Sequence, residues 1–381
     1  MKAYCLNKIS SVALATLKAP DTTVSDINDA DSILVRSQNM AEMELGKNIL
    51  AVARAGAGVN NIPIEEYAKK GVVVFNTPGA NANAVKELVL CGLLLSSRDI
   101  IGGNKWVNEH KDDEAIAKDA EKAKKEFAGH EIYGKTIAII GLGVIGVMVA
   151  NACQGLGMKV RGYDPYLTIN NAMKLSKDIV YFESIEEAVD GVDFVSIHVP
   201  LSEKTKGMIN KDIFAKLNGA TLVNFARDAL VNEDDLVDAL SKGEVRKYVS
   251  DFANPRVVNL PNAIILPHLG ASTEEAEDNC AMMAIDELKD YIENGNITHS
   301  VNYPDVHVGP KEGFNRVCVL HKNIPGAITK ITSTILDYNS NIISFANKSK
   351  GEYAYSIFDV EGKVDENRIS EIDGIIRVRI I

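Results

Sequence analysis

The 381-residue sequence lacks the usual marks of an exported, membrane-embedded or metal-binding chain. Its five cysteines are scattered and never form a C-x-x-C pair, so neither a disulfide framework nor a zinc site is expected. The longest apolar run, 88–95, has eight residues, far below the ~20 that span a bilayer. The start, MKAYCLNKIS, has no signal-peptide core. We therefore expect a soluble cytoplasmic protein without metal.

Positive charge is also scarce. The 41 Lys and Arg against 52 Asp and Glu give a net charge of −11, which argues against a nucleic-acid partner because no surplus cations could displace phosphate counterions. The composition, 46% hydrophobic and 24% charged, is that of an ordinary globular chain with a sizeable core. At this length two or three domains are expected.

Short apolar runs at 32–36, 49–54 and 72–76 predict buried strands of a parallel sheet. A long buried helix is predicted at 83–100, and the charged, Ala-rich stretch 108–128 indicates a solvated connecting helix.

From residue 136 strands and helices alternate again, which is typical of a doubly wound domain. A segment rich in Pro and Gly at 303–313 precedes a β-α-β-β-α-β pattern. The fold class predicted is α/β, with two doubly wound parallel-sheet domains followed by a small ferredoxin-like domain.

A dinucleotide site is predicted where TIAII runs into Gly141-Leu142-Gly143-Val144-Ile145-Gly146 and then into a helix. Gly141 makes the turn, Gly143 lets the backbone approach a pyrophosphate, and Gly146 lets helix and strand pack closely. Asp164, which ends the next strand, would bind the ribose and repel a 2′-phosphate, so NAD is favoured over NADP. The alternative is a tight turn without a nucleotide.

Three side chains stand at ends of predicted strands, where α/β domains place their ligands: Arg227, Asp251 and His268. An arginine, a carboxylate and a histidine suit hydride transfer, which needs a base, a group that holds the substrate carboxylate, and one that orients the nicotinamide. Arg227 could instead pair with Asp228, and His268 could be a core histidine. His198, also at a strand end, could only line the cofactor crevice.

With these residues in place, the chain resembles the D-isomer-specific 2-hydroxyacid dehydrogenases nearly end to end. The resemblance implies a substrate-side domain of residues 1–92 and 282–304, an inserted NAD-binding domain of 93–281, and an ACT-like domain of 314–381. The motifs that carry it are VRS (35–37), RAGAGVNNI (54–62), NTPGAN (76–81), GLGVIG (141–146), NFAR (224–227) and PHLGAST (267–273).

The resemblance implies residue roles. Arg227 would bind the substrate carboxylate, His268 would be the acid/base, and Asp251 would contact the nicotinamide amide. The substrate implied is 3-phosphoglycerate, oxidised to 3-phosphohydroxypyruvate, and a guanidinium suits its phosphate. Further substrate contacts are expected at Arg36, Ser37 and Asn81. Further cofactor contacts are expected at Val144, Ile145, Ala226 and Gly270.

One position departs from the family pattern. The glutamate that pairs with the family's histidine is replaced by Arg256, and a cation next to the imidazole would disfavour its protonated form. Asp228 likewise replaces the usual glycine and could weaken the field of Arg227. We expect a slower enzyme; rearrangement could instead bring Glu274 or Glu275 within reach. A dehydrogenase for another 2-hydroxy acid, or a catalytically impaired NAD-binding regulator, remain alternatives.

The C-terminal unit resembles an ACT domain, a module that binds amino acids at paired interfaces. The resemblance implies that L-serine would be held by His321, Asn323 and Asn341, in a homo-dimer or homo-tetramer. The alternative is that both asparagines are only turn residues.

Overall fold

The structure, a computed structural model, describes all residues from 1 to 381. The chain forms two compact units, residues 1–81 with 274–381, and residues 82–273. Helix α3 (Ala82–Ser97) packs on α6 and on strands β10 and β11 of the second unit. The boundary between the units therefore precedes this helix, whereas the sequence-based boundary at 92/93 left most of it in the first domain.

The first unit contains a five-stranded parallel sheet in the order β2-β1-β3-β4-β5. Apolar residues fill both faces of its central strands, as in a parallel sheet that helices cover on both sides. Its strands are β1 (Lys2–Cys5), β2 (Thr22–Val24), β3 (Ser32–Val35), β4 (Ala51–Arg54) and β5 (Val73–Asn76). Its helices are α1 (Ser11–Leu14), the 3-10 helix η1 (Ile27–Asp29), α2 (Ile64–Lys69) and α11 (Glu274–Asn294).

The second unit contains a seven-stranded parallel sheet in the order β12-β11-β10-β9-β6-β7-β8. The order reverses direction at β6 and β9, the switch point where doubly wound sheets bind ligands. The strands are β6 (Thr136–Ile140), β7 (Lys159–Tyr163), β8 (Val180–Tyr181), β9 (Phe194–Ile197), β10 (Ala220–Asn224), β11 (Val245–Ser250) and β12 (Ala263–Ile265). The helices are α6 (Val144–Gly155), α7 (Ile169–Ala172), α8 (Ile185–Val189), α9 (Lys211–Phe214), α10 (Glu233–Lys242), and the 3-10 helices η3 (Asp228–Leu230) and η4 (Val257–Asn259).

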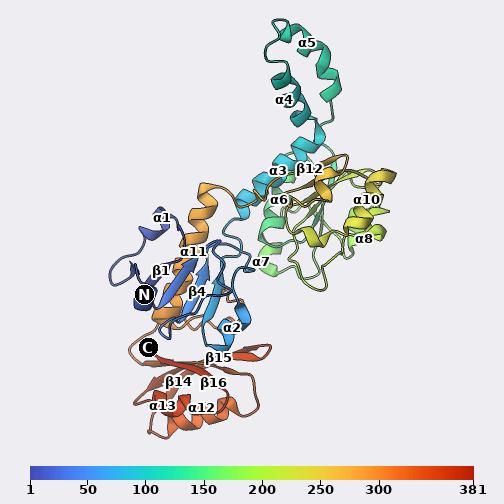
Figure 1. Cartoon of the computed structure of the whole chain (residues 1–381). Coiled ribbons are helices and arrows are strands. Elements are labelled where there is room, and N and C mark those ends of the chain that lie inside the picture. The colour runs from blue at the N-terminus through green and yellow to red at the C-terminus, as the bar shows by residue number, and fades with distance from the viewer. The chain divides into compact units, whose positions relative to one another are not determined.

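The charged stretch 108–128, expected as one connecting helix, forms part of a helical arm instead. The arm consists of α4 (Ile100–Glu109), α5 (Ile116–Ala123) and the 3-10 helix η2 (Lys124–Phe127), and it extends from the body of the second unit (Figure 1). None of these three helices contains a buried residue. The expected solvated character is therefore confirmed.

The C-terminal part of the first unit is a four-stranded antiparallel sheet in the order β14-β15-β13-β16, which is the ferredoxin-like order. Its two helices lie on one face of the sheet (Figure 1). The elements are β13 (Asn315–Lys322), α12 (Ala327–Leu336), β14 (Asn341–Lys350), β15 (Tyr353–Glu361), α13 (Glu366–Ser370) and β16 (Ile375–Ile380).

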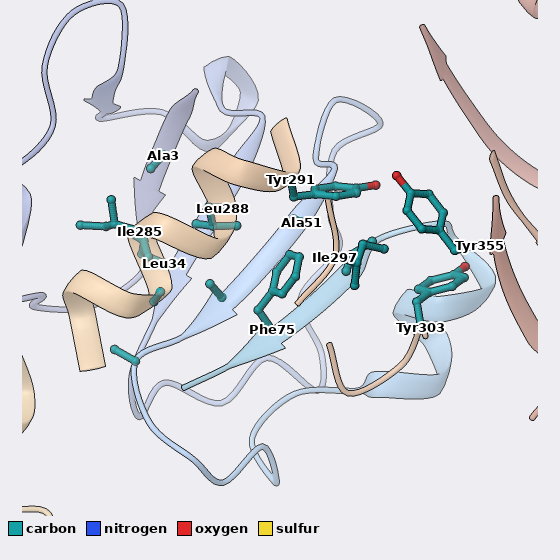
Figure 2. Packing of buried hydrophobic residues seen from close by; sticks show 14 of the residues in the cluster. Ala3, Leu34, Ala51, Phe75, Ile285, Leu288, Tyr291, Ile297, Tyr303 and Tyr355 are labelled. Atoms are coloured by element: carbon teal, nitrogen blue, oxygen red, sulfur yellow. The ribbon is translucent and has the colours of Figure 1, made fainter. Parts of the chain in front are cut away.

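The two sheets of the first unit share one hydrophobic core. Figure 2 shows Tyr355 of β15 close to Tyr291 of α11 and to Tyr303, with Phe75 of the five-stranded sheet beside them. The Tyr355 hydroxyl donates a hydrogen bond of 2.6 Å to the Gly295 carbonyl. Burial of these large rings stabilises the contact between the two sheets. Across the whole chain, no helix combines the length and apolar character needed to cross a membrane.

Candidate active site

The turn after β6 contains three glycines with three different constraints. Gly141 has a φ of +95°, and a Cβ there would meet the His198 carbonyl oxygen at 2.6 Å. A Cβ on Gly146 would meet the Gly141 carbonyl oxygen at 1.9 Å, so the helix could not pack on the turn with any larger residue. Around Gly143 the space is open. Gly141 and Gly146 therefore leave no room for a larger residue, whereas Gly143 leaves the backbone accessible.

This accessible backbone begins helix α6, whose N-terminus has no side-chain cap. An uncapped helix N-terminus offers free N–H groups and the positive end of the helix dipole to an anion. Asp164, next to β7, accepts hydrogen bonds from the backbone N–H groups of Leu142 and Tyr166, both at 2.8 Å. Asp164 thus fixes the turn, and its oxygens keep lone pairs for ribose hydroxyls. These residues fit the pyrophosphate and ribose of a dinucleotide.

Asp251 follows β11 and organises the neighbouring strand end. Its carboxylate accepts a hydrogen bond from the Gly270 N–H at 2.9 Å, and its backbone carbonyl accepts one from the His268 N–H at 2.8 Å. The other carboxylate oxygen is buried without a partner. Desolvation raises the pKa of Asp251, while Gly270, His268 and Arg227 each oppose that rise. The expected Arg227, Asp251 and His268 therefore share one electrostatic neighbourhood at the ends of adjacent strands.

His268 is exposed and has a φ of +48°. Its ring lies edge-on to the Phe252 ring, with the two ring centroids 5.0 Å apart. The ring forms no hydrogen bond within the structure. A core histidine would be enclosed and bonded. The alternative of a hydrogen-bonded core histidine is therefore not observed, and both ring nitrogens are free to form hydrogen bonds with a bound molecule.

Arg227 follows β10 and is half-buried. Its guanidinium donates a hydrogen bond of 2.6 Å to the Ala226 carbonyl. Asp228, proposed above as an alternative partner, accepts instead from the Ala229 N–H at 2.8 Å, and no ion pair links it to Arg227. The guanidinium thus keeps most of its donors for an anion.

Arg256 does not lie where the sequence suggested. Its guanidinium forms an ion pair with Asp234 of α10, and its side chain is 49% exposed. The expected contact between a cation and the His268 ring is therefore not observed, because the Arg256 guanidinium turns toward α10. The carboxylate coupled to His268 in this chain is that of Asp251.

His198, the competing histidine, follows β9. Its Nε2 lies 2.9 Å from the Ser196 hydroxyl, and desolvation lowers the pKa of His198 to about 3. The ring therefore stays neutral at physiological pH. It lines the turn at Gly141 rather than acting as a second acid/base candidate.

In the first unit, Arg36 follows β3 and pairs with Glu277 of α11 at 2.6 Å; both side chains are 41% exposed. Asn7 holds the backbone here, because its side chain accepts from the Arg36 N–H at 2.9 Å and donates to the Ser37 hydroxyl at 3.3 Å. The predicted cation is thus present at a strand end, but it already has an anionic partner.

The loops after β4 and β5 are bonded to one another. Thr77 and Gly56 exchange two hydrogen bonds, at 2.8 and 3.2 Å, and Asn76 donates to the Ala57 carbonyl at 2.6 Å. Asn81, at the end of the second loop, has a buried side-chain oxygen without a partner. Such an oxygen is suited to accept a hydrogen bond from a ligand.

The sequence of the chain is similar to that of a known protein family. The domain family described as "D-isomer specific 2-hydroxyacid dehydrogenase, NAD binding domain" matches residues 90–270. A curated D-3-phosphoglycerate dehydrogenase from Haemophilus influenzae is 32% identical over 93% of this chain and 87% of that protein. The chain belongs to the D-isomer specific 2-hydroxyacid dehydrogenase family.

Other relatives match part of the chain. D-3-phosphoglycerate dehydrogenase from Methanocaldococcus jannaschii is 33% identical over 82% of this chain, which covers 59% of that relative. The crystal structure of NAD+-bound 3-phosphoglycerate dehydrogenase from Entamoeba histolytica has a TM-score of 0.62 and 28% identity, covering 79% of this chain and 98% of that one. The family that the sequence motifs resemble and the predicted α/β fold class are therefore confirmed.

In the C-terminal sheet, one candidate effector residue is already bonded within the structure. His321, expected to bind an effector, lies in β13 and is 2% exposed; its Nδ1 lies 2.8 Å from the Lys322 carbonyl and its Nε2 2.9 Å from the Ser356 hydroxyl. Both ring nitrogens are engaged. To contact an effector, the ring would have to give up one of these bonds.

Asn323 and Asn341 are exposed, but the structure does not bring them together. Asn323 lies beside Gly351 and Glu352, whereas Asn341 pairs with Glu361 at the other end of β15. With ~3.3 Å per residue, the two asparagines are about 25 Å apart along the sheet.

Arg54, to which the sequence analysis assigns no role, ends β4 within the RAGAGVNNI motif. Its Nε donates to the Arg36 carbonyl at 2.9 Å, and its Nη1 donates to the Gly58 carbonyl. It links the loops after β3 and β4. The strand-end rule that found Arg227 would have found it too.

Proposed function

We propose that this family member is an NAD-dependent dehydrogenase that oxidises 3-phosphoglycerate to 3-phosphohydroxypyruvate. The observation that carries the proposal is the placement of Arg227, Asp251 and His268 at the ends of adjacent strands of the sheet whose β6 turn fits a dinucleotide. The names of the phosphoglycerate dehydrogenases among its relatives support the choice of substrate.

The roles follow from the chemistry of each group. The N-terminus of α6 would hold the cofactor pyrophosphate, with Val144 and Ile145 in its first turn, and Asp164 would hold the ribose. The cofactor supplies the hydride acceptor. Arg227 would bind the substrate carboxylate through its free donors, and His268 would accept the hydroxyl proton at a ring nitrogen.

Asp251 has two tasks in this proposal. Its unpartnered oxygen would accept a hydrogen bond from the nicotinamide amide, and its charge would stabilise the imidazolium that forms when His268 takes the proton. Its backbone and carboxylate already fix His268 and Gly270. Asp251 would thereby supply the negative charge that the residue at position 256 does not.

The substrate phosphate would be held in the first unit by Arg36, with Ser37 and Asn81 as further contacts. For Arg36 this requires exchange of its Glu277 partner for phosphate, which is feasible because the pair is exposed. A substrate without a phosphate would offer no anionic group for Arg36 to bind.

The deciding experiment is a spectrophotometric assay with purified full-length protein. We expect NADH to form from 3-phosphoglycerate and to be consumed with 3-phosphohydroxypyruvate, at least tenfold more efficiently than with unphosphorylated 2-hydroxy or 2-oxo acids. Equal or better turnover of the unphosphorylated acids would favour a different 2-hydroxyacid dehydrogenase. Tight NADH binding without turnover of any substrate would favour a regulator and contradict the proposal.

We also propose that L-serine binds the C-terminal domain between two copies of the chain. The separation of Asn323 from Asn341 supports this arrangement, because a site using both needs one asparagine from each copy. L-serine should inhibit the oligomer, and Asn341→Ala should abolish inhibition without changing turnover in its absence. Inhibition that persists in a monomer would contradict it.

A further inference from the structure

A cavity of about 480 Å³ lies between one face of α11 and the segment 296–299, apart from the strand ends described above. The helical residues that line it recur at the spacing of a single helix face. The lining residues are Asn279, Met282, Met283, Asp286, Glu287, Asp290, Asn296, Thr298 and His299. Its size is within the range of small-molecule sites.

The charge on this cavity is negative. Three acidic side chains, Asp286, Glu287 and Asp290, line it. Asp290 is partly satisfied, because one of its oxygens accepts from the Asn294 and Asn296 amides, both at 2.9 Å. Asp286 is exposed. Glu287 is different from both.

Glu287 is a buried carboxyl group with one satisfied oxygen. Its side chain is 6% exposed, and its Oε1 lies 2.8 Å from Nδ1 of His299. Its Oε2 is buried and has no hydrogen-bond partner. A buried polar atom without a partner is costly, so the site favours a molecule that donates a hydrogen bond there.

The surroundings of Glu287 favour a cation. Desolvation raises its pKa to about 9, with further contributions from Asp305 and Asp286. The other titratable groups that face it are Asp290, on its own helix, and His299. No lysine or arginine lines the cavity. The only other groups nearby that can carry a positive charge are two histidines: His299, and His307, whose Nδ1 lies 3.7 Å from the Asp290 carboxylate.

The chemistry of the wall selects the kind of cation. The structure contains no cluster of three His, Cys, Asp or Glu residues that could hold a metal ion. Met282 and Met283 present thioether and methylene groups, which suit an aliphatic chain. An ammonium group, with three donors, matches the acidic oxygens and the Asn279 amide oxygen.

We propose that this cavity binds a small aliphatic ammonium ion, with its nitrogen at Glu287 and its hydrocarbon chain along Met282 and Met283. Binding converts the Glu287 carboxyl into a carboxylate, and the released proton goes to solvent. The site lies outside the groups of the proposed dehydrogenase reaction, so its test is independent of turnover.

The proposal predicts a proton-linked affinity. Because the carboxyl must lose its proton, the apparent Kd for an ammonium ion should fall by up to about tenfold per pH unit from pH 7 to 8.5. Close to one proton should be released per ligand at pH 7.5.

The test is isothermal titration calorimetry of the full chain with 1,4-diaminobutane, in two buffers of different ionisation enthalpy. Butane-1,4-diol, a neutral molecule of the same length, serves as the ligand control. Glu287→Gln keeps the shape of the residue and should weaken diamine binding at least tenfold and remove proton release. Glu293→Gln, an exposed position on the same helix outside the cavity, should bind as the original chain does.

Three results would overturn the proposal: no diamine binding at 10 mM ligand, binding of the diol as tight as that of the diamine, or undiminished binding by Glu287→Gln. The first two need no variant and remain decisive if Glu287→Gln fails to fold. Thermal unfolding of each variant establishes that it is folded before titration.

Discussion

The strand ends of the two parallel sheets carry the same kinds of residue in different electrostatic states. At the ends of β10, β11 and β12, Arg227 has no carboxylate partner, and Asp251 is buried with one oxygen unpartnered. At the end of β3, Arg36 is already paired with Glu277 and half exposed. The first arrangement is preorganised for an anion, whereas the second must exchange one anion for another.

This difference has an energetic consequence. A preorganised donor costs no rearrangement when charge develops, so it can act on the reaction itself. An arginine that must leave a carboxylate contributes only the difference between two ion pairs in water, which is small. We therefore expect the seven-stranded sheet to govern kcat and the five-stranded sheet to govern KM.

The largest expected effect comes from His268→Gln, which removes the proton acceptor and keeps a polar side chain of similar size. The value of kcat should fall by about 10²- to 10⁴-fold, the usual contribution of a general base. NADH affinity, measured by fluorescence titration, should change by less than about twofold because the α6 turn is untouched. A variant that keeps more than a tenth of the original kcat would remove His268 from the acid/base role.

A matched pair of arginine substitutions tests the comparison directly. Arg227→Lys should lower kcat/KM by about 10- to 150-fold, because it loses a charged hydrogen bond worth about 1.5–3 kcal/mol. Arg36→Lys should raise KM for 3-phosphoglycerate by less than about tenfold and leave kcat unchanged. Steady-state kinetics of both variants give the two values. If Arg36→Lys lowers kcat as strongly as Arg227→Lys, the expectation that the two sheets govern different kinetic constants is wrong.

Glu277→Gln should remove the ion-pair partner of Arg36 and so strengthen its binding of the substrate phosphate. An exposed ion pair is worth up to about 1 kcal/mol, so removal of its anionic member should lower KM for the phosphorylated substrate by at most about fivefold. The effect should shrink as salt is raised, because exposed charges are screened. The neighbouring Glu274→Gln, at the start of the same helix, serves as control. An unchanged KM at low salt would indicate that Glu277 does not compete with the phosphate.

The comparison also explains what the sequence could and could not predict. Arg227, Asp251 and His268 were found because they follow β-strands within a few residues, and the edge at which parallel strands end is a local property. The different roles of the three glycines in the β6 turn were predictable for the same reason. The family resemblance supplied the roles of these residues, but not their surroundings.

Long-range pairing was not predictable. The partner of Arg36 is 241 positions away on α11, and that of Arg256 is on α10, so both depend on how helices pack rather than on any local pattern. His321 was expected to bind an effector, but its burial and its two hydrogen-bonding partners follow from pairing of β13 with β15, which no local pattern shows. Side-chain partners that depend on tertiary packing could therefore not be predicted from the sequence.

His198, at the end of β9, should affect stability rather than turnover. Its pKa is lowered to about 3 by desolvation, whereas in the unfolded chain it is about 6.5. Between these values the unfolded state binds a proton that the folded state does not, so stability falls as pH falls through that window. His198→Gln removes this loss and keeps a hydrogen-bonding group near Ser196. The difference in Tm between variant and original chain should therefore move in favour of the variant from pH 7 to pH 4, as measured by thermal unfolding. A difference that is constant over this range would mean that His198 protonates equally in both states, and the strand ends of the seven-stranded sheet would then be less shielded from water than the comparison requires.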